Sequence, residues 1–358
     1  MKRRIRFQKP KNWNRHIKSL FAALMLTMSF FASCKNPMVN YLLGEQKKTE
    51  EWIDTSPVAW WNGTWYYSLT EAINAANDGT AAVPSSIEIR RDITRFASMG
   101  GDGIIVPTGK FIQLKPRTPD AAIITMRRWE AGGAFFTVES GASLTLDAGM
   151  IIDGARIVSS GPLVMVKAGA AFTMDDGSLV TRGRSSGPGG GVYVDNDMST
   201  TFTMKGSARV TDTDVYLETG AKITIDGILS ANPVARITPQ VYPDTATPLI
   251  QVLDGGDIAN IDGDGIKNNE KFDVSPENVA GWSGPRHWRV DDNGELYVAV
   301  ARRFAAGLNI YYPTLQDAFD AAIGVSAANF ETVTLIANIE LDAADAFDVD
   351  SARYIRLT

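Results

Sequence analysis

Apolar residues alternate with polar ones in short runs through the middle of the chain, and these runs repeat. One copy occupies positions 136–146, where two apolar-x-apolar runs flank a turn of glycine and alanine. Further copies begin at positions 164, 192 and 215. Alternation with a period of two is typical of half-buried β-strands, so each copy predicts two short strands joined by a turn.

One copy with two short strands is too small to bury its apolar face alone, whereas stacked copies bury their apolar faces against one another. Stacking also places like residues over like residues, which predicts an outward ladder of threonines: Thr145, Thr173, Thr203 and Thr224. The glycine turns and the missing 3.6-residue period disfavour a helical solenoid. The repeats therefore predict an all-β fold, a right-handed parallel β-helix solenoid.

The segment before the repeats predicts a β-α-β cap for the N-terminal end of the solenoid. Positions 60–67 suit a hairpin closed by Asn62 and Gly63, and Ser68 to Glu71 has the spacing of a capping box that opens a helix. A strand at 87–89 follows. The open end of a solenoid has unpaired backbone groups, so it needs such a cover. The aromatic residues of this segment either pack the cap or form a platform that stacks sugars.

The same module returns near the end of the chain. Positions 311–322 match 66–76 with one inserted residue, 333–335 match 87–89, and 354–357 match 111–114. We therefore expect a capped β-helix domain at 58–300 and the start of a second, truncated unit at 301–358. The alternative is a finished protein that ends in a closing module of this type.

The first 33 residues have the composition of an export signal. Their beginning is rich in lysine and arginine without any acid, and an apolar run then leads to Cys34, the only cysteine of the chain. Small residues directly before Cys34 resemble the recognition sequence of a bacterial lipoprotein signal peptidase. The sequence differs from that pattern at Phe31, where leucine is usual. We expect a lipoprotein signal peptide at 1–33, lipidation of Cys34 and a membrane-proximal linker at 34–57. An ordinary signal peptide or an uncleaved anchor is the alternative.

Lipidation at Cys34 would place the protein in a bacterial cell envelope, at the outer membrane or the cell surface. The membrane would then be a partner through the N-terminal lipid. Several acyl chains hold a protein firmly on a bilayer, whereas a single chain holds it only marginally.

Charge and residue types limit the chemistry. The chain carries a formal net charge of -6, and removal of the basic signal leaves about -14. This charge argues against nucleic acid as a partner, because phosphates require a basic surface. Beyond the signal, His287 is the one histidine and Cys34 the one cysteine, which excludes a Cys/His zinc site and a cysteine-histidine pair. We interpret His287 as a surface residue.

Three motifs carry a resemblance to a known family. They are Gly-Gly-Gly-Val-Tyr-Val at 189–194, the Gly-Ala-x-apolar-Thr-apolar copies, and Tyr-Tyr-x-Leu-x-Glu-Ala at 66–72. They resemble bacterial surface lipoproteins with right-handed β-helix repeats, a pectate-lyase-like architecture. The resemblance implies fold and location for roughly 58–358. It implies little about activity, because that architecture carries lyases, hydrolases, adhesins and passive surface proteins.

Two arginines and two aspartates are the candidates for a polysaccharide lyase site. Lyases on a β-helix use clustered acids for calcium and a basic residue, often arginine, to abstract the proton next to a uronate carboxyl. Arg182 and Arg184 are separated from Asp195 and Asp197 by the loop 185–191. The acids do not recur at one position of successive copies, which favours an interpretation as turn and loop residues.

An acid-rich run at 257–270 is the candidate calcium loop. Counting from Asn260, oxygen ligands fall at loop positions 1, 3, 5 and 9, which are Asn260, Asp262, Asp264 and Asn268. Lys271 stands at position 12, where a calcium loop has its bidentate glutamate. The alternative is a solvated corner of the solenoid without metal.

These observations favour a lipid-anchored, surface-exposed β-helix protein that acts as a noncatalytic scaffold for adhesion or interaction. Its expected partners are carbohydrate or host and matrix proteins, and no cofactor is expected apart from calcium. The alternative is a carbohydrate-active enzyme, either a calcium-dependent polysaccharide lyase or a glycoside hydrolase.

Overall fold

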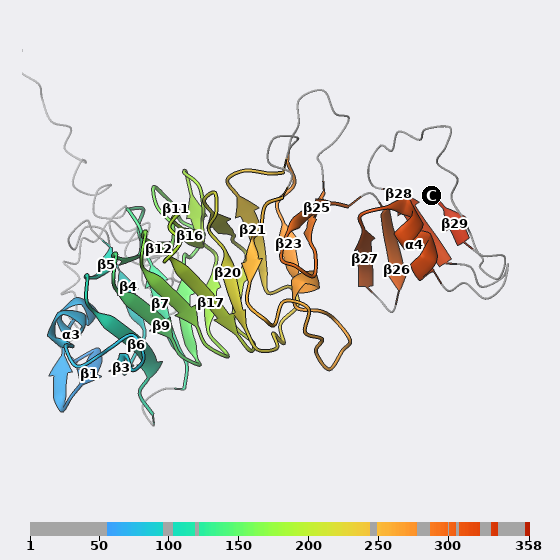
Figure 1. The fold of residues 1–358 in the computed structure, drawn as a ribbon. Helices are drawn as coiled ribbons and strands as arrows, with labels where there is room; N and C mark the ends of the chain where they lie inside the picture. Colours follow the sequence, from blue (N-terminus) through green and yellow to red (C-terminus); the bar gives the residue numbers. More distant parts are fainter. Residues whose placement is uncertain are drawn as a thin grey trace, which may run out of the picture. The chain divides into compact units, whose positions relative to one another are not determined.

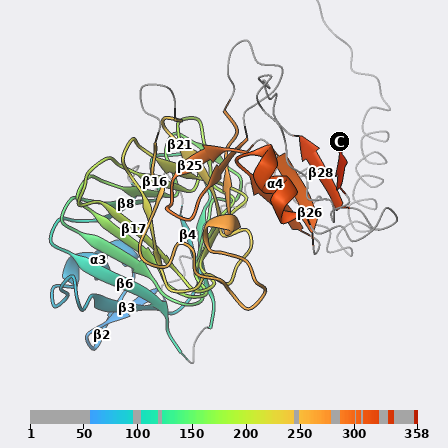
Figure 2. The same ribbon diagram turned by 45° about the vertical axis from the view of Figure 1, so that its right-hand side comes forward.

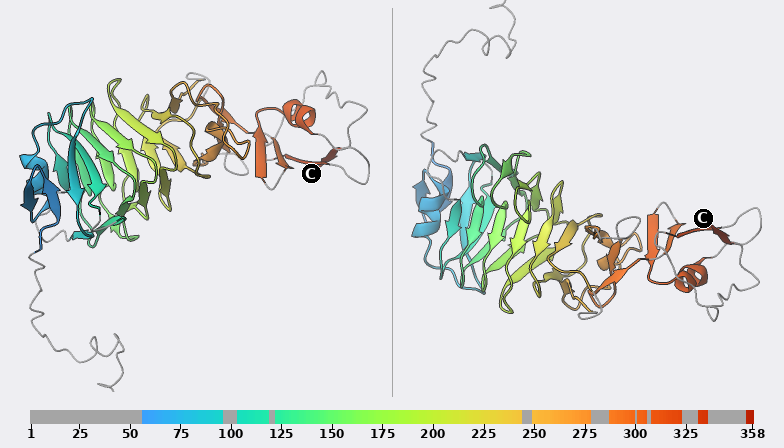
Figure 3. Two further views of the ribbon diagram at one scale, coloured as in Figure 1. Left: turned by 90° about the horizontal axis from the view of Figure 1, so that it is seen from below. Right: turned by 90° about the horizontal axis from the view of Figure 1, so that it is seen from above.

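The predicted all-β solenoid is confirmed. The computed structural model describes residues 56–95, 103–118, 122–243, 249–277, 287–299, 301–305, 308–322, 331–335 and 355–358. Within this part of the chain, short strands stack into a parallel β-solenoid of about six turns (Figure 1). Figures 2 and 3 show the strands of successive coils side by side from further directions.

Each complete coil contributes one strand to each of three sheets. The first contains nine described strands in the spatial order β2 (Thr64–Tyr66), β1 (Ala59–Trp61), β3 (Ser85–Ile89), β6 (Phe111–Pro116), β9 (Ser143–Leu146), β13 (Ala171–Met174), β17 (Thr201–Lys205), β20 (Ile223–Asp226) and β22 (Leu253–Asp254). The second contains five, in the order β18 (Arg209–Thr211), β14 (Leu179–Thr181), β10 (Met150–Asp153), β7 (Ile124–Arg128) and β4 (Ile93–Arg95). The third contains seven, in the order β23 (Phe272–Val274), β21 (Ala235–Pro239), β19 (Val215–Leu217), β16 (Val192–Val194), β12 (Val164–Val166), β8 (Phe136–Val138) and β5 (Ile104–Val106).

The core consists of columns of like residues, one from each coil. Val166 of β12 pairs with Val138 of β8 and with Val194 of β16, and Val194 pairs with Leu217 of β19. All four side chains are buried. Each coil thus covers the apolar face of its neighbour, as the repeats predict.

A second column, in the first sheet, contains two stacked phenylalanines. Phe172 pairs with Phe202, and their rings lie 5.3 Å apart with an interplanar angle of 11°. Both are fully buried. Large identical side chains at equivalent positions therefore pack face to face along the solenoid axis.

The outward threonine ladder is also confirmed. Thr173 pairs with Thr145 and Thr203, and Thr203 pairs with Thr224. All four are half-buried and alternate with buried residues on their strands. The turn that precedes this ladder has a glycine with φ of 70–92° in three coils (Gly141, Gly169 and Gly220), a backbone conformation that other residues adopt only at a cost.

The structure adds a third strand to each of the first three repeats. The sequence pattern predicts two strands per copy, but β10, β14 and β18 follow the copies as members of the second sheet. β14 and β18 each have a single buried residue, and β10 is apolar at three successive positions, so none of them shows the apolar-x-apolar alternation of the predicted strands.

The predicted cap covers the N-terminal end of the first sheet. β1 and β2 form an antiparallel hairpin around Asn62 and Gly63, and β1 also pairs antiparallel with β3. Helix α3 (Leu69–Ala75) follows, with Ser68 Oγ accepting the N–H of Glu71 at 3.1 Å. The buried residues of α3 belong to the same core as the coils. The cap is therefore continuous with the solenoid.

The C-terminal module repeats the arrangement of the cap. β26 (Ala301–Ala305) and β27 (Leu308–Tyr312) form a hairpin, helix α4 (Leu315–Ala321) follows, and β28 (Glu331–Leu335) and β29 (Ile355–Leu357) pair in parallel. The spatial order β27-β26-β28-β29 is the order β2-β1-β3-β6 of the first cap. Ala301 pairs with Tyr312 and Leu335, as Ala59 pairs with Tyr66 and Ile89. The C-terminal module thus has the topology of the first cap, as its sequence predicts, and it has a small core of its own.

Shorter elements complete the described chain. β11 (Val158–Ser159) and β15 (Arg184–Ser185) pair in parallel, and β24 (Trp288–Val290) and β25 (Leu296–Val298) pair antiparallel. The 3-10 helix η2 (Asn269–Lys271) directly precedes β23. It ends the acid-rich run that the sequence marks as a calcium loop.

Candidate functional site

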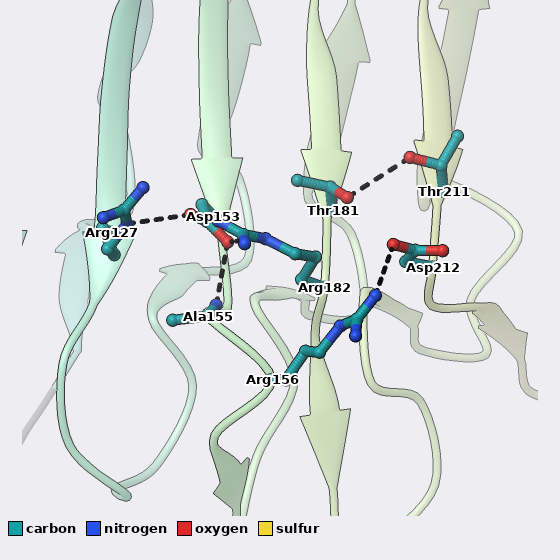
Figure 4. Close-up of polar contacts among 8 residues, drawn as sticks. All are labelled: Arg127, Asp153, Ala155, Arg156, Thr181, Arg182, Thr211 and Asp212. Carbon is teal, nitrogen blue, oxygen red and sulfur yellow. Dashed lines mark hydrogen bonds and ion pairs between the residues drawn. The ribbon is translucent and has the colours of Figure 1, made fainter.

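A cluster of charged residues lies where strands of the second sheet end (Figure 4). Asp153 is the last residue of β10, and the register places it beside Arg127 of β7 and Thr181 of β14. The Asp153 carboxylate accepts hydrogen bonds from Arg182 Nε at 2.8 Å, from Arg127 Nε at 2.9 Å and from the Ala155 N–H at 2.8 Å. A second nitrogen of Arg182 also binds this carboxylate, so the Arg182 contact is bidentate. Three coils are joined by this one side chain.

The cluster keeps its charges at neutral pH. The Asp153 side chain is 2 % exposed, and burial opposes its ionisation. Hydrogen bonds from Arg182, the Ala155 N–H and Arg127 outweigh burial and hold the pKa of Asp153 below its usual value. In turn, the hydrogen bond to Asp153 raises the pKa of Arg182. The arrangement is therefore a charged, hydrogen-bonded group rather than a neutral acid beside a neutral base.

Backbone strain is concentrated at the same corner. Ala155, Arg156, Arg182 and Asp212 have φ values of 51°, 62°, 57° and 55°, in the left-handed region that disfavours residues with a Cβ. Arg156 donates to Asp212 Oδ2 at 3.2 Å across the coils. Strained residues persist where their surroundings hold them in place. Here the N–H of Arg156 donates to the Arg182 carbonyl at 2.9 Å, and the N–H of Arg182 donates to the Thr211 carbonyl at 3.2 Å.

The structure does not join the four predicted lyase residues. Arg182 binds Asp153, and the side chain of Arg184 is exposed on β15. Asp195 accepts the N–H of Ala168 at 3.3 Å and that of Asn196 at 2.9 Å. Asp197 accepts the Ser199 N–H at 2.7 Å. Among the described residues, no hydrogen bond or ion pair links these arginines to these aspartates.

The four predicted calcium ligands have partners within the protein or face solvent. Asn260 Nδ2 donates to Asp257 Oδ1 at 2.5 Å, and Asp264 is exposed. Asn268 is fully buried, with Oδ1 accepting the Leu229 N–H at 2.9 Å. In the part of the chain that the structure describes, no three acidic, histidine or cysteine side chains lie close enough together to hold a metal ion. Calcium at this loop stays a prediction.

The Asp262 carboxylate binds a lysine instead. Lys271 Nζ lies 2.8 Å from Asp262 Oδ2, while Asp262 Oδ1 accepts the N–H groups of Asp264 at 2.9 Å and Ile266 at 3.1 Å. The hydrogen bond from Lys271, with those from the two N–H groups, lowers the pKa of Asp262 to about 2. The loop is thus organised around a carboxylate that already has a cationic partner.

Sequence reasoning missed two further buried charges. Asp153 ends β10, a strand that the repeat pattern does not predict, so nothing in the sequence marks it as a buried acid. Arg128 is 4 % exposed and donates to the carbonyls of Gly161 at 3.2 Å and Pro162 at 2.8 Å, and burial lowers its pKa to about 10. Its carbonyl partners carry no side-chain signal, so no motif search finds them.

The predicted lipidation site lies outside the described residues, as do the signal and most of the linker. Among the helices that the structure describes, none has the length and apolar content to span a bilayer. Lipidation of Cys34 stays a prediction.

Comparison with protein-family models, with curated proteins and with solved structures finds no match to this chain. The described fold is therefore a β-solenoid whose resemblance to pectate-lyase-like surface lipoproteins stays a prediction.

Proposed function

We propose that the protein is a lipid-anchored, surface-exposed scaffold that binds a carbohydrate or a matrix protein through the outer face of its β-solenoid and catalyses no reaction. The observation that favours this proposal over the lyase alternative is the bidentate contact between Arg182 and Asp153. A lyase needs a base that gives up its proton readily at the working pH. The Asp153 hydrogen bond moves the pKa of Arg182 in the opposite direction.

The outer faces of the sheets support a binding role. On the third sheet, Tyr193 and Tyr216 pair in register and stack with ring centroids 5.2 Å apart. Tyr193 also donates to Glu218 through its hydroxyl. Half-buried aromatic side chains held in one conformation on rigid strands contribute contact area at a low entropic cost. Such a surface suits a partner that lies along several coils.

Two assays on the purified full chain test the proposal. The first incubates it with polygalacturonate and with alginate, with and without calcium, and measures new reducing ends and unsaturated uronate. No turnover is expected. Any turnover would contradict the proposal, and turnover that is lost in Arg182→Lys or in Asp195→Asn would support the lyase alternative.

The second assay measures binding to immobilised polysaccharides and matrix proteins. Binding that is weakened by the double change Tyr193→Ala and Tyr216→Ala is the expected result. The double change Thr145→Ala and Thr173→Ala on the first sheet is the matched control, and it should leave binding intact. Equal effects of both pairs would show that the third sheet has no special role.

A further inference from the structure

The loop that ends in η2 encloses a buried lysine. The side chain of Lys271 is 0 % exposed, and that of Asp262 is 10 % exposed. A lysine is rarely buried to this degree unless its charge is paired. Its surroundings must therefore compensate for the lost hydration of the ammonium group.

Three acceptors meet the three N–H groups of this ammonium. Asp262 Oδ2 lies 2.8 Å from Nζ, the Leu229 carbonyl accepts a second hydrogen bond, and Asn268 Oδ1 lies at 3.5 Å. An ammonium group has three donors and no acceptor, so its hydrogen bonds are satisfied within the protein. These acceptors come from two segments that are far apart in sequence.

Asn268 holds the acceptors in place. This buried side chain donates from Nδ2 to the Gly227 carbonyl at 3.0 Å and to the Asp257 carbonyl at 2.8 Å. Its Oδ1 accepts the Leu229 N–H, and that contact brings the Leu229 carbonyl to the loop. The oxygen atoms of Asp262, Leu229 and Asn268 are therefore held around one position by contacts within the protein.

We propose that this position is a cation site whose occupant is the ammonium group of Lys271, tethered by its own side chain. Two of the positions that resemble a calcium loop, Asp262 and Asn268, hold this ammonium in place of a metal. The residue at position 12, where calcium loops have a glutamate, supplies the cation instead of a ligand. The loop is thus ordered without calcium, and removal of the ammonium leaves a site for a small primary ammonium ion.

Two measurements on the unmodified full chain test the proposal. Thermal unfolding followed by circular dichroism should give the same Tm in calcium chloride and in EDTA. Labelling with an acetylating reagent should modify Lys267, whose side chain is 35 % exposed, while Lys271 reacts only after unfolding. A calcium-dependent rise in Tm that disappears in Asp262→Asn, or equal labelling of the two lysines, would overturn the proposal.

Removal of the ammonium supplies the direct test. Lys271→Ala should lower Tm by roughly 10 °C, because the change leaves a mostly buried carboxylate without its cation. The control Lys267→Ala removes an exposed ion pair with Asp292 from the same loop and should change Tm by at most about 2 °C.

Addition of n-propylammonium, which has the atoms missing from Lys271→Ala, should restore part of the lost Tm. Sodium chloride at the same concentration should not. Recovery with calcium but not with propylammonium would overturn the proposal, as would equal Tm values for the two alanine variants. Should Lys271→Ala fail to fold, Asp262→Asn and the labelling of the unmodified chain still decide the question.

Discussion

Arg182 and Asp153 form a bidentate ion pair across adjacent coils, and Arg182 makes it from a left-handed backbone position with φ of 57°. The ion pair stabilises the folded state, whereas the left-handed backbone conformation of the same residue destabilises it. The two contributions can be separated, because glycine adopts this φ at little cost whereas the Cβ of alanine makes it unfavourable.

We therefore expect Arg182→Gly to be less destabilising than Arg182→Ala. Both variants lose the charged hydrogen bonds to a buried carboxylate, which should cost about 2 kcal/mol of unfolding free energy. Alanine should lose about 1 kcal/mol more because of its Cβ. Urea unfolding measures both values, with the exposed Arg184→Ala as the control. A larger loss for glycine than for alanine would show that the corner is not strained.

The stacked phenylalanines give a prediction for the core. Phe202→Ala should lower the free energy of unfolding by about 4 kcal/mol, since it leaves a cavity beside Phe172 inside a continuous column. Thr203→Ala changes the next residue of the same strand, which faces outward, and should cost about 0.5 kcal/mol or less. Chemical unfolding of both variants provides the measurement. Similar losses for both would contradict the assigned register.

Acid should weaken the fold in a defined pH range. The folded pKa of Asp262 is about 2 and that of Asp153 is below its usual value, while the pKa of an unfolded aspartate is about 3.9. A lowered carboxyl pKa stabilises the folded state above the unfolded pKa, and this stabilisation is lost as the pH falls through the folded pKa. Guanidinium unfolding at several pH values should show a decline between about pH 4 and pH 2. In Asp262→Asn this decline should be smaller, and an unchanged decline would speak against the role of Asp262.

Lipidation of Cys34 predicts incorporation of a fatty acid. Metabolic labelling of the producing bacterium with a labelled fatty acid should mark the parent chain and leave Cys34→Ala unlabelled. Ser29→Ala, in the apolar run before the cysteine, should keep the label. A labelled Cys34→Ala variant would exclude this anchor.

The repeated strands were predictable because their cause is local. Two residues of the same apolar column, such as Val138 and Val166, stand in the same place of their copies, and burial of alternate side chains needs no long-range information. The cap was predictable for the same reason, since Ser68 and Glu71 lie within one helical turn. The strands of the second sheet were missed because their residues do not alternate between apolar and polar; β14 and β18, for example, each bury a single residue.

The charged clusters could not be predicted because their partners are distant in the chain. Arg127 and Arg182 are 26 and 29 residues from Asp153, and neither sequence neighbourhood indicates a buried acid. The run at 257–270 has oxygen-bearing side chains at the spacing of a calcium loop, but the direction of each side chain depends on the coil against which the loop packs.

By itself, the sequence determined that the chain stacks as a β-solenoid, because alternating apolar residues at recurring positions bury one another in only a few arrangements. Only the tertiary structure decided which charges meet. Leu229 lies 42 residues before Lys271, and only the fold brings its carbonyl to the Lys271 ammonium group. Hydrophobic burial follows from a local pattern, whereas compensation of a buried charge requires specific atoms from several coils at hydrogen-bonding distance.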